Sequence, residues 1–367
     1  MPAKAEAATP GDQPEEPAAE AASAASNLPE VPGDVPERSH ALWHLLLRAF
    51  GRTPRPREIE VWEQRLARGI DARAFIRQLV ASRQFSGTRF VRAHNPPGHY
   101  FSPVVDPDQV RDYVEMVRRA GPDDLPGIVF DLDAMEAFWR ANRAWIAATP
   151  FTPEPRPGAR YFYAGGPYSY GDAITLRAMM GHYRPRRIVE IGSGLSTACM
   201  LDTAEELGLS EFSLTCVEPY PRRLRSLLRP GDEARLTLHE RPVQGMPLDL
   251  FRGLEPNDIL FIDSTHVLKT GSDVHYELFY ILPALARGVV VHFHDCRFPL
   301  EYSDIQIFQK NYSWNEAYGV RALLMDSTRY RVIFSGSLFA AEREALVRET
   351  CADFLRNPGS ALWIAVV

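Results

Sequence analysis

The stretch Arg187-Ile-Val-Glu-Ile-Gly-Ser-Gly-Leu-Ser-Thr197 decides the fold. Its first five residues form a short apolar run rich in β-branched side chains, which is typical of a buried strand. Gly192 and Gly194 follow at once, and residues 195–208 then have the pattern of a helix that ends at Gly208. A strand, a glycine turn and a helix N-terminus bring backbone N–H groups close to a ligand, because no Cβ lies in the way.

An acidic residue, Glu218, ends the next predicted strand, residues 212–217. A carboxylate at that place in a doubly wound sheet can accept hydrogen bonds from both hydroxyls of a ribose. The glycine spacing is Glu190-x-Gly192-x-Gly194, and it lacks the third glycine of dinucleotide-binding turns. The turn and the acid together therefore favour a nucleoside-containing cofactor, and the spacing argues against an NAD-dependent dehydrogenase.

Composition narrows the class of protein. The 367 residues suffice for one large α/β domain and a smaller one. The formal net charge of −6 provides no basic field for non-specific nucleic-acid binding, so we expect no nucleic-acid partner. The four cysteines form no Cys-x-x-Cys pair, which argues against a zinc ribbon and fits a reducing cytosol. We find no bilayer-spanning stretch and no secretory pattern, and we expect a cytoplasmic protein.

Four segments follow one another along the chain. Residues 1–37 are rich in Ala, Pro and Glu without an aromatic residue, so we expect a disordered tail. Residues 38–96 contain three short amphipathic helices, and we expect this small all-α module to serve docking or homo-oligomerisation. Residues 97–160 are expected to be a helical linker or lid region, and residues 161–367 are expected to form the main domain.

Strands and helices alternate through the main domain. This alternation predicts an α/β fold with a doubly wound, mostly parallel seven-stranded sheet covered on both faces, preceded by the all-α module. The expected strands are residues 187–191, 212–217, 235–239, 258–263, 288–293, 330–334 and 362–366. The expected helices of this domain include residues 195–208, 221–228, 272–286 and 305–325.

A loop dense in tyrosine and glycine, residues 161–171, precedes the helix that leads to the first strand. Two interpretations stay open. The loop is either a lid or acceptor wall over the cofactor, or a surface loop whose tyrosines pack on the domain.

Four polar residues stand at the ends of two further strands. Asp263 ends the fourth strand and is followed by His266, and His294-Asp295 end the fifth. Because the carboxyl ends of neighbouring parallel strands share one edge, these four residues should converge in one pocket. Two facing carboxylates without a cation would keep one of them protonated. Mg²⁺ suits two carboxylates with water, whereas a histidine ligand favours Mn²⁺ or Fe²⁺.

These motifs resemble a known family. The turn with Glu190, Gly192 and Gly194 resembles motif I of the class I S-adenosylmethionine-dependent methyltransferases, whose fold is Rossmann-like. The order Asp263-Ser-Thr-His266 and then His294-Asp295-x-x-x-Pro299 is similar to one bacterial group. That group includes the macrolide-sugar O-methyltransferases of the macrocin and mycinamicin type and the cephalosporin hydroxylase-like proteins. Further matches are Tyr100-x-Ser102-Pro103, Pro126-Gly127-Ile128, Gly271-Ser-Asp273 and Trp314-x-Glu316.

The resemblance implies a cofactor and a set of site residues. The cofactor is S-adenosyl-L-methionine, and the residues expected around it are Glu190, Gly192, Ser193, Gly194, Ser196, Glu218 and Asp263. Asp263 and Asp295 are implied as ligands of a divalent cation, and His266 as the general base. His294 stands where the metal-dependent members have Glu; we expect it as a third ligand, with Mg²⁺ preferred and Mn²⁺ or Fe²⁺ open.

The expected reaction follows from the reactivity of the cofactor. The sulfonium methyl is already activated, so the protein must align an acceptor oxygen and make it nucleophilic. A cation that lowers the pKa of the acceptor hydroxyl, together with a nearby general base, makes its oxygen nucleophilic. We therefore expect O-methylation of a sugar, glycoside or related natural-product or envelope polyol. Two alternatives stay open: a cephalosporin hydroxylase-like redox component with bound iron, and a non-catalytic S-adenosylmethionine-binding partner protein.

Overall fold

The computed structural model describes residues 32–33, 35–50, 53–80, 98–163 and 168–367, and the chain divides into two compact units, residues 1–104 and 105–367. The expected disordered tail falls almost entirely outside the described residues. The same holds for the end of the helical module and for residues 164–167 of the tyrosine-rich loop.

The first unit contains the three helices expected in the small module. They are α2 (His40–Phe50), α3 (Pro56–Ala67) and α4 (Ala72–Val80), and a 3-10 turn, Glu37–Ser39, precedes them. Their apolar faces enclose a small core in which Trp43, Leu46 and Trp62 are almost fully buried. Amphipathic spacing therefore predicted these helices correctly.

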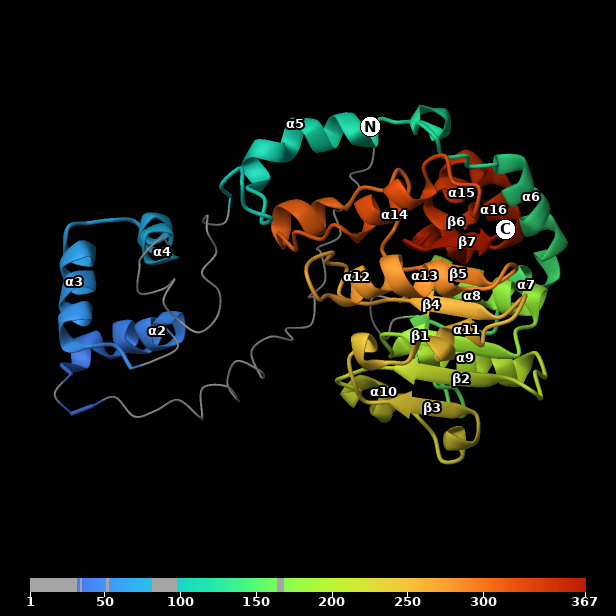
Figure 1. The fold of residues 1–367 in the computed structure, drawn as a ribbon, viewed down its shortest axis with the longest axis horizontal. Helices are drawn as coiled ribbons and strands as arrows, with labels where there is room; N and C mark the ends of the chain where they lie inside the picture. Colours follow the sequence, from blue (N-terminus) through green and yellow to red (C-terminus); the bar gives the residue numbers. More distant parts are fainter. Residues whose placement is uncertain (1–31, 34, 51–52, 81–97, 164–167) are drawn as a thin grey trace, which may run out of the picture. The chain divides into compact units, whose positions relative to one another are not determined.

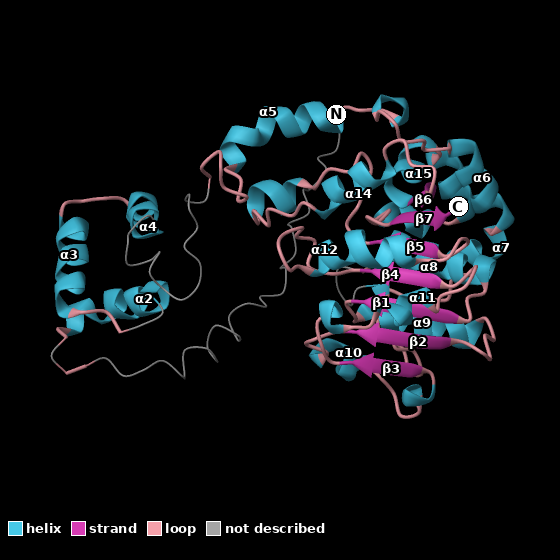
Figure 2. Ribbon diagram, in the orientation of Figure 1, coloured by secondary structure: helices cyan, strands magenta, loops and turns pink. Residues whose placement is uncertain are grey.

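The second unit is built on one seven-stranded sheet (Figures 1 and 2). Its strands are β1 (Arg187–Ile191), β2 (Ser213–Val217), β3 (Leu236–His239), β4 (Ile259–Ile262), β5 (Val290–Phe293), β6 (Tyr330–Ser335) and β7 (Leu362–Val366). The spatial order is β3-β2-β1-β4-β5-β7-β6. Strands β1 to β5 pair in parallel, whereas β7 runs antiparallel between β5 and β6. The predicted fold class and all seven predicted strands are confirmed.

The order of the strands reverses between β1 and β4, because the chain proceeds from β1 to one side and from β4 to the other. In an open parallel sheet such a switch point leaves a crevice at the carboxyl ends of the strands, where ligands bind. The glycine turn follows β1 directly, and Asp263 follows β4. The topology therefore places the predicted ligand-binding turn at the crevice.

Two separate groups of helices flank the sheet (Figure 2). The first group is α6 (Leu132–Ala141), α7 (Arg143–Ala147), α8 (Tyr170–Tyr183), α9 (Leu195–Glu206), α10 (Arg222–Leu227), α15 (Gly336–Glu342) and α16 (Glu344–Thr350). The second group is α11 (Leu248–Arg252), α12 (Asp273–Tyr276), α13 (Leu282–Ala284) and α14 (Glu316–Leu324). A further helix, α5 (Pro107–Arg118), packs on the π-helical stretch Ile305–Gln309. The layers thus enclose the sheet on both faces.

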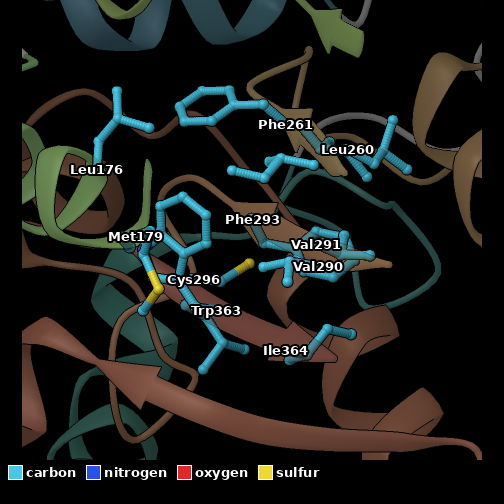
Figure 3. Close-up of a cluster of buried hydrophobic side chains, with 14 of the residues drawn as sticks. Leu176, Met179, Leu260, Phe261, Val290, Val291, Phe293, Cys296, Trp363 and Ile364 are labelled. Carbon is cyan, nitrogen blue, oxygen red and sulfur yellow. The ribbon is translucent and has the colours of Figure 1, made fainter. Parts of the chain in front are cut away.

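The core lies between the central strands and α8 (Figure 3). Phe261 of β4, Phe293 of β5 and Trp363 of β7 are fully buried, and Leu176 and Met179 of α8 belong to the same cluster. Burial of each such side chain stabilises the fold by about 1.5–3 kcal/mol. This packing holds the strand ends, and with them the polar residues that follow the strands.

The segment between residues 97 and 160, expected as a linker or lid, contributes to the same core. Met135, Trp139 and Ile146 of α6 and α7 are buried in it, and Trp139 packs edge-on against Phe354. The two helices α6 and α7 of this segment meet at Asn142, which divides them. Whether any part of the segment closes over a ligand stays a prediction.

Two other expected helices are interrupted. Residues 272–286 form α12, the π-helical stretch Glu277–Ile281 and α13. Residues 305–325 form a π-helical stretch and then α14, with a non-helical segment between them. At the end of that segment Asn315, and at the start of α14 Glu316, donate their backbone N–H groups to the carbonyl of His266, at 3.0 and 3.2 Å. The break therefore anchors a site loop, and helical periodicity does not reveal it.

Within the part of the chain that the structure describes, no helix combines the length and the apolar character needed to cross a membrane.

Candidate active site

The glycine turn meets the end of β4 at very short range. Gly192 has φ +78°, and a Cβ there would lie 1.8 Å from the backbone oxygen of Asp263. Any side chain at this position would collide with backbone, so the turn requires glycine. Gly194 forms the N-cap of α9, and the helix dipole makes this end favourable for an anionic or electron-rich group.

Two cavities open on either side of Asp263. The smaller, of about 450 Å³, has a lining that includes Gly192, Glu218, Val243, Gln244 and Asp263. The larger has a volume of about 690 Å³. Its lining includes Ser193, Gly194, Ser196, Asp263, His266, His294 and Asp295. All predicted site residues except Glu190 thus line one cavity or the other.

Glu190 lies behind the turn. It is fully buried, and its carboxylate accepts hydrogen bonds from Ser196 Oγ and Thr197 Oγ1, both at 2.5 Å. Burial raises the pKa of Glu190 to about 7, against the effect of these hydrogen bonds. These bonds tie β1 to the first turn of α9, and a contact of Glu190 with the cofactor stays a prediction.

Glu218 ends β2 on the wall of the smaller cavity, as predicted. One carboxylate oxygen accepts the backbone N–H of Ser193 at 3.1 Å, and the other accepts that of Tyr220 at 2.7 Å. These bonds hold the carboxylate against the glycine turn while each oxygen keeps a further lone pair for a ligand. Its contact with a ribose stays a prediction.

The predicted convergence of Asp263, His266, His294 and Asp295 in one pocket is confirmed. His266 Nε2 lies 3.5 Å from Asp263 Oδ1 and 3.8 Å from Asp295 Oδ2. The ends of two neighbouring strands therefore present both carboxylates to the same imidazole nitrogen.

His266 is held in one orientation. Its Nδ1 lies 2.7 Å from Glu316 Oε2, and its ring packs on Trp314 with a centroid distance of 4.3 Å. Burial disfavours the imidazolium, but hydrogen bonds with Asp263 and Glu316 outweigh burial and raise the pKa of His266 to about 11. An unperturbed histidine titrates near neutral pH. Asp263 and Glu316 instead keep a proton on His266 in this structure.

The backbone is left-handed at two of these residues. His266 has φ +60° and Asp295 has φ +53°. A non-glycine residue in this region costs roughly 1–2 kcal/mol. Such strain persists only where the surroundings impose it, and it is concentrated at ligand-binding sites.

His294 is buried, and its Nδ1 has no hydrogen-bond partner among the described residues. Its ring lies between His292 and Tyr168, at centroid distances of 5.7 and 5.4 Å. Burial lowers the pKa of His294, but the charges of Asp263, Asp172 and Asp295 raise it more. An orphaned imidazole nitrogen in an acidic cavity is a feature that a ligand would satisfy.

The expected three-ligand metal group is not formed by the described residues. No three His, Cys, Asp or Glu side chains among them are arranged to hold a metal ion. The two carboxylates by themselves still suit Mg²⁺, which is commonly bound through one or two carboxylates and several waters.

Some site residues escaped the sequence analysis. Asp172, at the start of α8, is buried, and its Oδ1 accepts the backbone N–H groups of Ser360 and Ala361 at 3.0 and 3.2 Å. Ser360 Oγ in turn donates to Asp295 Oδ1 at 2.8 Å. Burial raises the pKa of Asp172 to about 6. The position of Ser360 and Ala361 just before β7 is a signal for this part of the site. Because β7 runs antiparallel to β5, its first residues lie beside the end of β5.

The tyrosine-rich loop divides between its two interpretations. Tyr161 and Tyr163 are buried against Phe151, so they pack on the domain. Tyr168 is buried as well but lines the larger cavity. Residues 164–167 lie outside the described residues.

The second unit is similar in sequence to known proteins. Residues 189–296 match a family model described as a methyltransferase domain. Over 189 residues the chain is 31% identical to an uncharacterized protein of Archaeoglobus fulgidus, with 50% of this chain and 84% of the relative covered.

Similar solved structures include an SAH-bound methyltransferase of Podospora anserina, with 16% identity, 71% of this chain and 94% of that chain covered, and a TM-score of 0.36. Another is an O-methyltransferase from Bacillus cereus in complex with SAH, with 16% identity, coverage of 71% and 97%, and a TM-score of 0.33.

Proposed function

Because the chain belongs to the family of the archaeal relative and is an S-adenosylmethionine-dependent methyltransferase, we propose that it methylates a hydroxyl of a sugar, glycoside or related polyol. The observation that carries this proposal is the larger cavity. It brings Asp263, Asp295 and His266 together directly beside the glycine turn. Carboxylates and an imidazole are groups that bind and deprotonate a hydroxyl, whereas a hydroxyl without them is a poor nucleophile.

The two cavities suit the two halves of the cofactor. The adenosine half would occupy the smaller cavity, where Glu218 would accept the ribose hydroxyls and Val243 contributes apolar lining. The amino-acid half would lie at the N-terminus of α9, beside Gly194 in the larger cavity. Asp263 lines both cavities, so the sulfonium methyl would lie near it.

The wall of the larger cavity supports a sugar acceptor. Tyr312 and Trp314 line it and stack on each other with a centroid distance of 4.5 Å. An aromatic face beside hydrogen-bonding groups suits a sugar ring, which has apolar C–H faces and hydroxyl edges. Ser303 and Gln306 on the same wall supply such groups.

Asp263 and Asp295 are the residues that would hold a divalent cation. A bound divalent cation lowers the pKa of a coordinated hydroxyl. The two aspartates orient the acceptor oxygen, and the walls of the cavity hold it in line with the methyl group, which can supply about 7–11 kcal/mol of the barrier.

His266 is proposed as the general base. Glu316 would retain the proton on Nδ1, so that Nε2, which faces Asp263 and Asp295, accepts the hydroxyl proton in the neutral form. A cation held by Asp263 and Asp295 would neutralise their negative charges. The pKa of His266 would then fall, and the imidazole would lose its second proton more readily.

The decisive experiment measures transfer of a labelled methyl group to a panel of glycosides. We expect transfer that EDTA abolishes and Mg²⁺ or Mn²⁺ restores, and Asp295→Asn should lose both the activity and Mn²⁺ binding followed by electron paramagnetic resonance. Asp249→Asn, at an exposed position outside both cavities, is the control. Full activity in EDTA would remove the cation from the proposal, and cofactor binding without transfer to any glycoside would contradict the reaction.

For the first unit, we propose docking of a partner protein or a second copy of the chain. Its helices expose Leu45, Val61, Leu66 and Ile76, each at more than a third of its surface. Exposed apolar side chains on a small helical module are typical of such a role.

A further inference from the structure

Two arginines line the larger cavity, and their guanidinium groups have no partner among the residues that the structure describes. Arg223 lies on α10, and Arg297 follows β5. Neither side chain makes a hydrogen bond or an ion pair with any described residue, and both are exposed. Both are therefore available to a ligand in the cavity.

The two buried arginines among the described residues are both paired. Arg160 is bound by Asp202 and Asp232, and Arg177 by Glu206. The chain has 47 acidic and 41 basic side chains apart from histidine, so it has no general excess of positive charge. Arg222 and Arg287 are also exposed without a partner among the described residues, so Arg223 and Arg297 are distinguished by their position on the wall of the candidate active site.

The cavity has charges of opposite sign at different places. Asp172, Asp263 and Asp295 form one acidic group, which would repel an anionic acceptor. Arg297 stands only two residues beyond Asp295, across Cys296. A ligand can therefore present a hydroxyl to Asp295 and an anionic group to Arg297 at the same time.

The two arginines lie toward different parts of the site. A Cβ at Gly194 would lie 3.2 Å from Arg223 Cδ, so Arg223 stands against the turn that faces the cofactor. Arg297 stands on the segment that follows β5 and shares the cavity with Ser303 and Gln306 of the proposed acceptor wall. Arg297 is the arginine placed to contact the acceptor.

We propose that Arg297 binds an anionic group of the acceptor, so that the substrate is an acidic glycoside carrying a carboxylate or phosphate near the methylated hydroxyl. The guanidinium fork matches the geometry of both anions. Two residues span at most about 7 Å, so the hydroxyl and the anionic group lie on the same sugar ring or on adjoining rings. This inference rests on the proposed function, because it concerns the acceptor of the same reaction.

The test measures binding of three probes to the full-length protein saturated with S-adenosylhomocysteine. The probes are 4-nitrophenyl β-glucoside, its uronic acid counterpart and its 6-phosphate, and titration calorimetry gives each affinity. We expect one anionic probe to bind at least about tenfold more tightly than the neutral glucoside. The better of the two anionic probes identifies the carboxylate or the phosphate as the group bound.

The variants isolate Arg297. Arg297→Gln should remove the preference for the anionic probe, whereas Arg287→Gln should retain it. Arg287 precedes β5 at the opposite edge of the sheet, is exposed and lines neither cavity, so this control removes the same charge.

Three results would overturn the inference: no binding of any probe, no preference for an anion, or a preference that survives in Arg297→Gln. Its failure can be told apart from failure of the proposed function. Metal-dependent transfer to neutral glycosides that Arg297→Gln leaves intact would retain the function and reject the anion site. Anion preference through Arg297 without any methyl transfer would retain the anion site and reject the proposed function.

Discussion

Replacement of Gly192 by alanine tests the contact on which the whole site depends. The glycine has φ +78°, and the added Cβ would lie 1.8 Å from the backbone oxygen of Asp263 and 2.9 Å from its carbonyl carbon. An ordinary C···O contact is about 3.3 Å, so one of the two strand ends would have to move by more than 1 Å. The backbone of Asp263, and its carboxylate with it, would shift.

A matched control, Gly208→Ala, separates the loss of stability in Gly192→Ala into two parts. Gly208, just beyond α9, also has positive φ, +61°, but a Cβ there would meet nothing within 4 Å. Gly208→Ala should cost only the left-handed strain, roughly 1–2 kcal/mol. Gly192→Ala adds the overlap with backbone, a further 1–3 kcal/mol or so.

Urea denaturation measures the free energy of unfolding of both variants, and calorimetry measures their affinity for S-adenosylhomocysteine. We expect Gly192→Ala to be the less stable variant and to bind at least about tenfold more weakly, since the turn lines the cofactor cavity. Gly208→Ala should bind as the wild type does. Equal losses of stability together with unchanged binding in both variants would refute the reasoning.

Three other predictions follow from single contacts. Glu218→Gln should weaken S-adenosylhomocysteine binding about tenfold or more, because a charged acceptor of ribose hydroxyls becomes neutral. Ser360→Ala should weaken Mn²⁺ binding about tenfold by freeing Asp295, with affinity for S-adenosylhomocysteine unchanged. Burial raises the pKa of Asp232, but its hydrogen bonds with Arg160 outweigh burial and the net shift is downward. Its stabilisation is therefore complete above the unfolded pKa of about 3.9 and lost as the pH falls through the folded pKa. The stability difference between wild type and Asp232→Asn, from urea midpoints, should be larger at pH 7 than at pH 3.

Each of these variants has a control of the same chemistry outside the site. Glu255→Gln removes a carboxylate at the opposite edge of the sheet, and Ser213→Ala removes a hydroxyl at the start of β2. Asp249→Asn removes an exposed carboxylate paired with Arg252. Unchanged binding in Glu218→Gln, unchanged Mn²⁺ affinity in Ser360→Ala, or a pH-independent difference for Asp232→Asn would each contradict the role assigned to that residue.

Much of the fold was accessible from local pattern. Short β-branched runs such as residues 187–191 and 362–366 predicted all seven strands, and the alternation with helices predicted the parallel core. Parallel strands place their carboxyl ends at one edge, so the convergence of Asp263 with Asp295 followed from topology alone. These predictions were correct because they depend on the spacing of apolar residues and on the direction of the chain. Both can be determined from the sequence alone.

The helices were predicted less well where the chain makes long-range contacts. The expected helix over residues 305–325 is broken, because Asn315 and Glu316 donate backbone hydrogen bonds to His266, about 50 residues earlier. Helical propensity does not include a partner so distant in sequence, and tertiary contacts override it.

The sequence by itself determined the order of elements, the glycine turn and the strand-end acids, since each depends on neighbouring residues or on the register of a strand. Only the tertiary structure decided what surrounds those acids. Asp172 reaches Ser360 across 188 positions to orient Asp295, and Glu316 together with Asp263 keeps a proton on His266. Burial and electrostatic coupling depend on distances in space. Residues far apart in the sequence become neighbours only when the sheet forms, so their separation along the chain does not predict these distances.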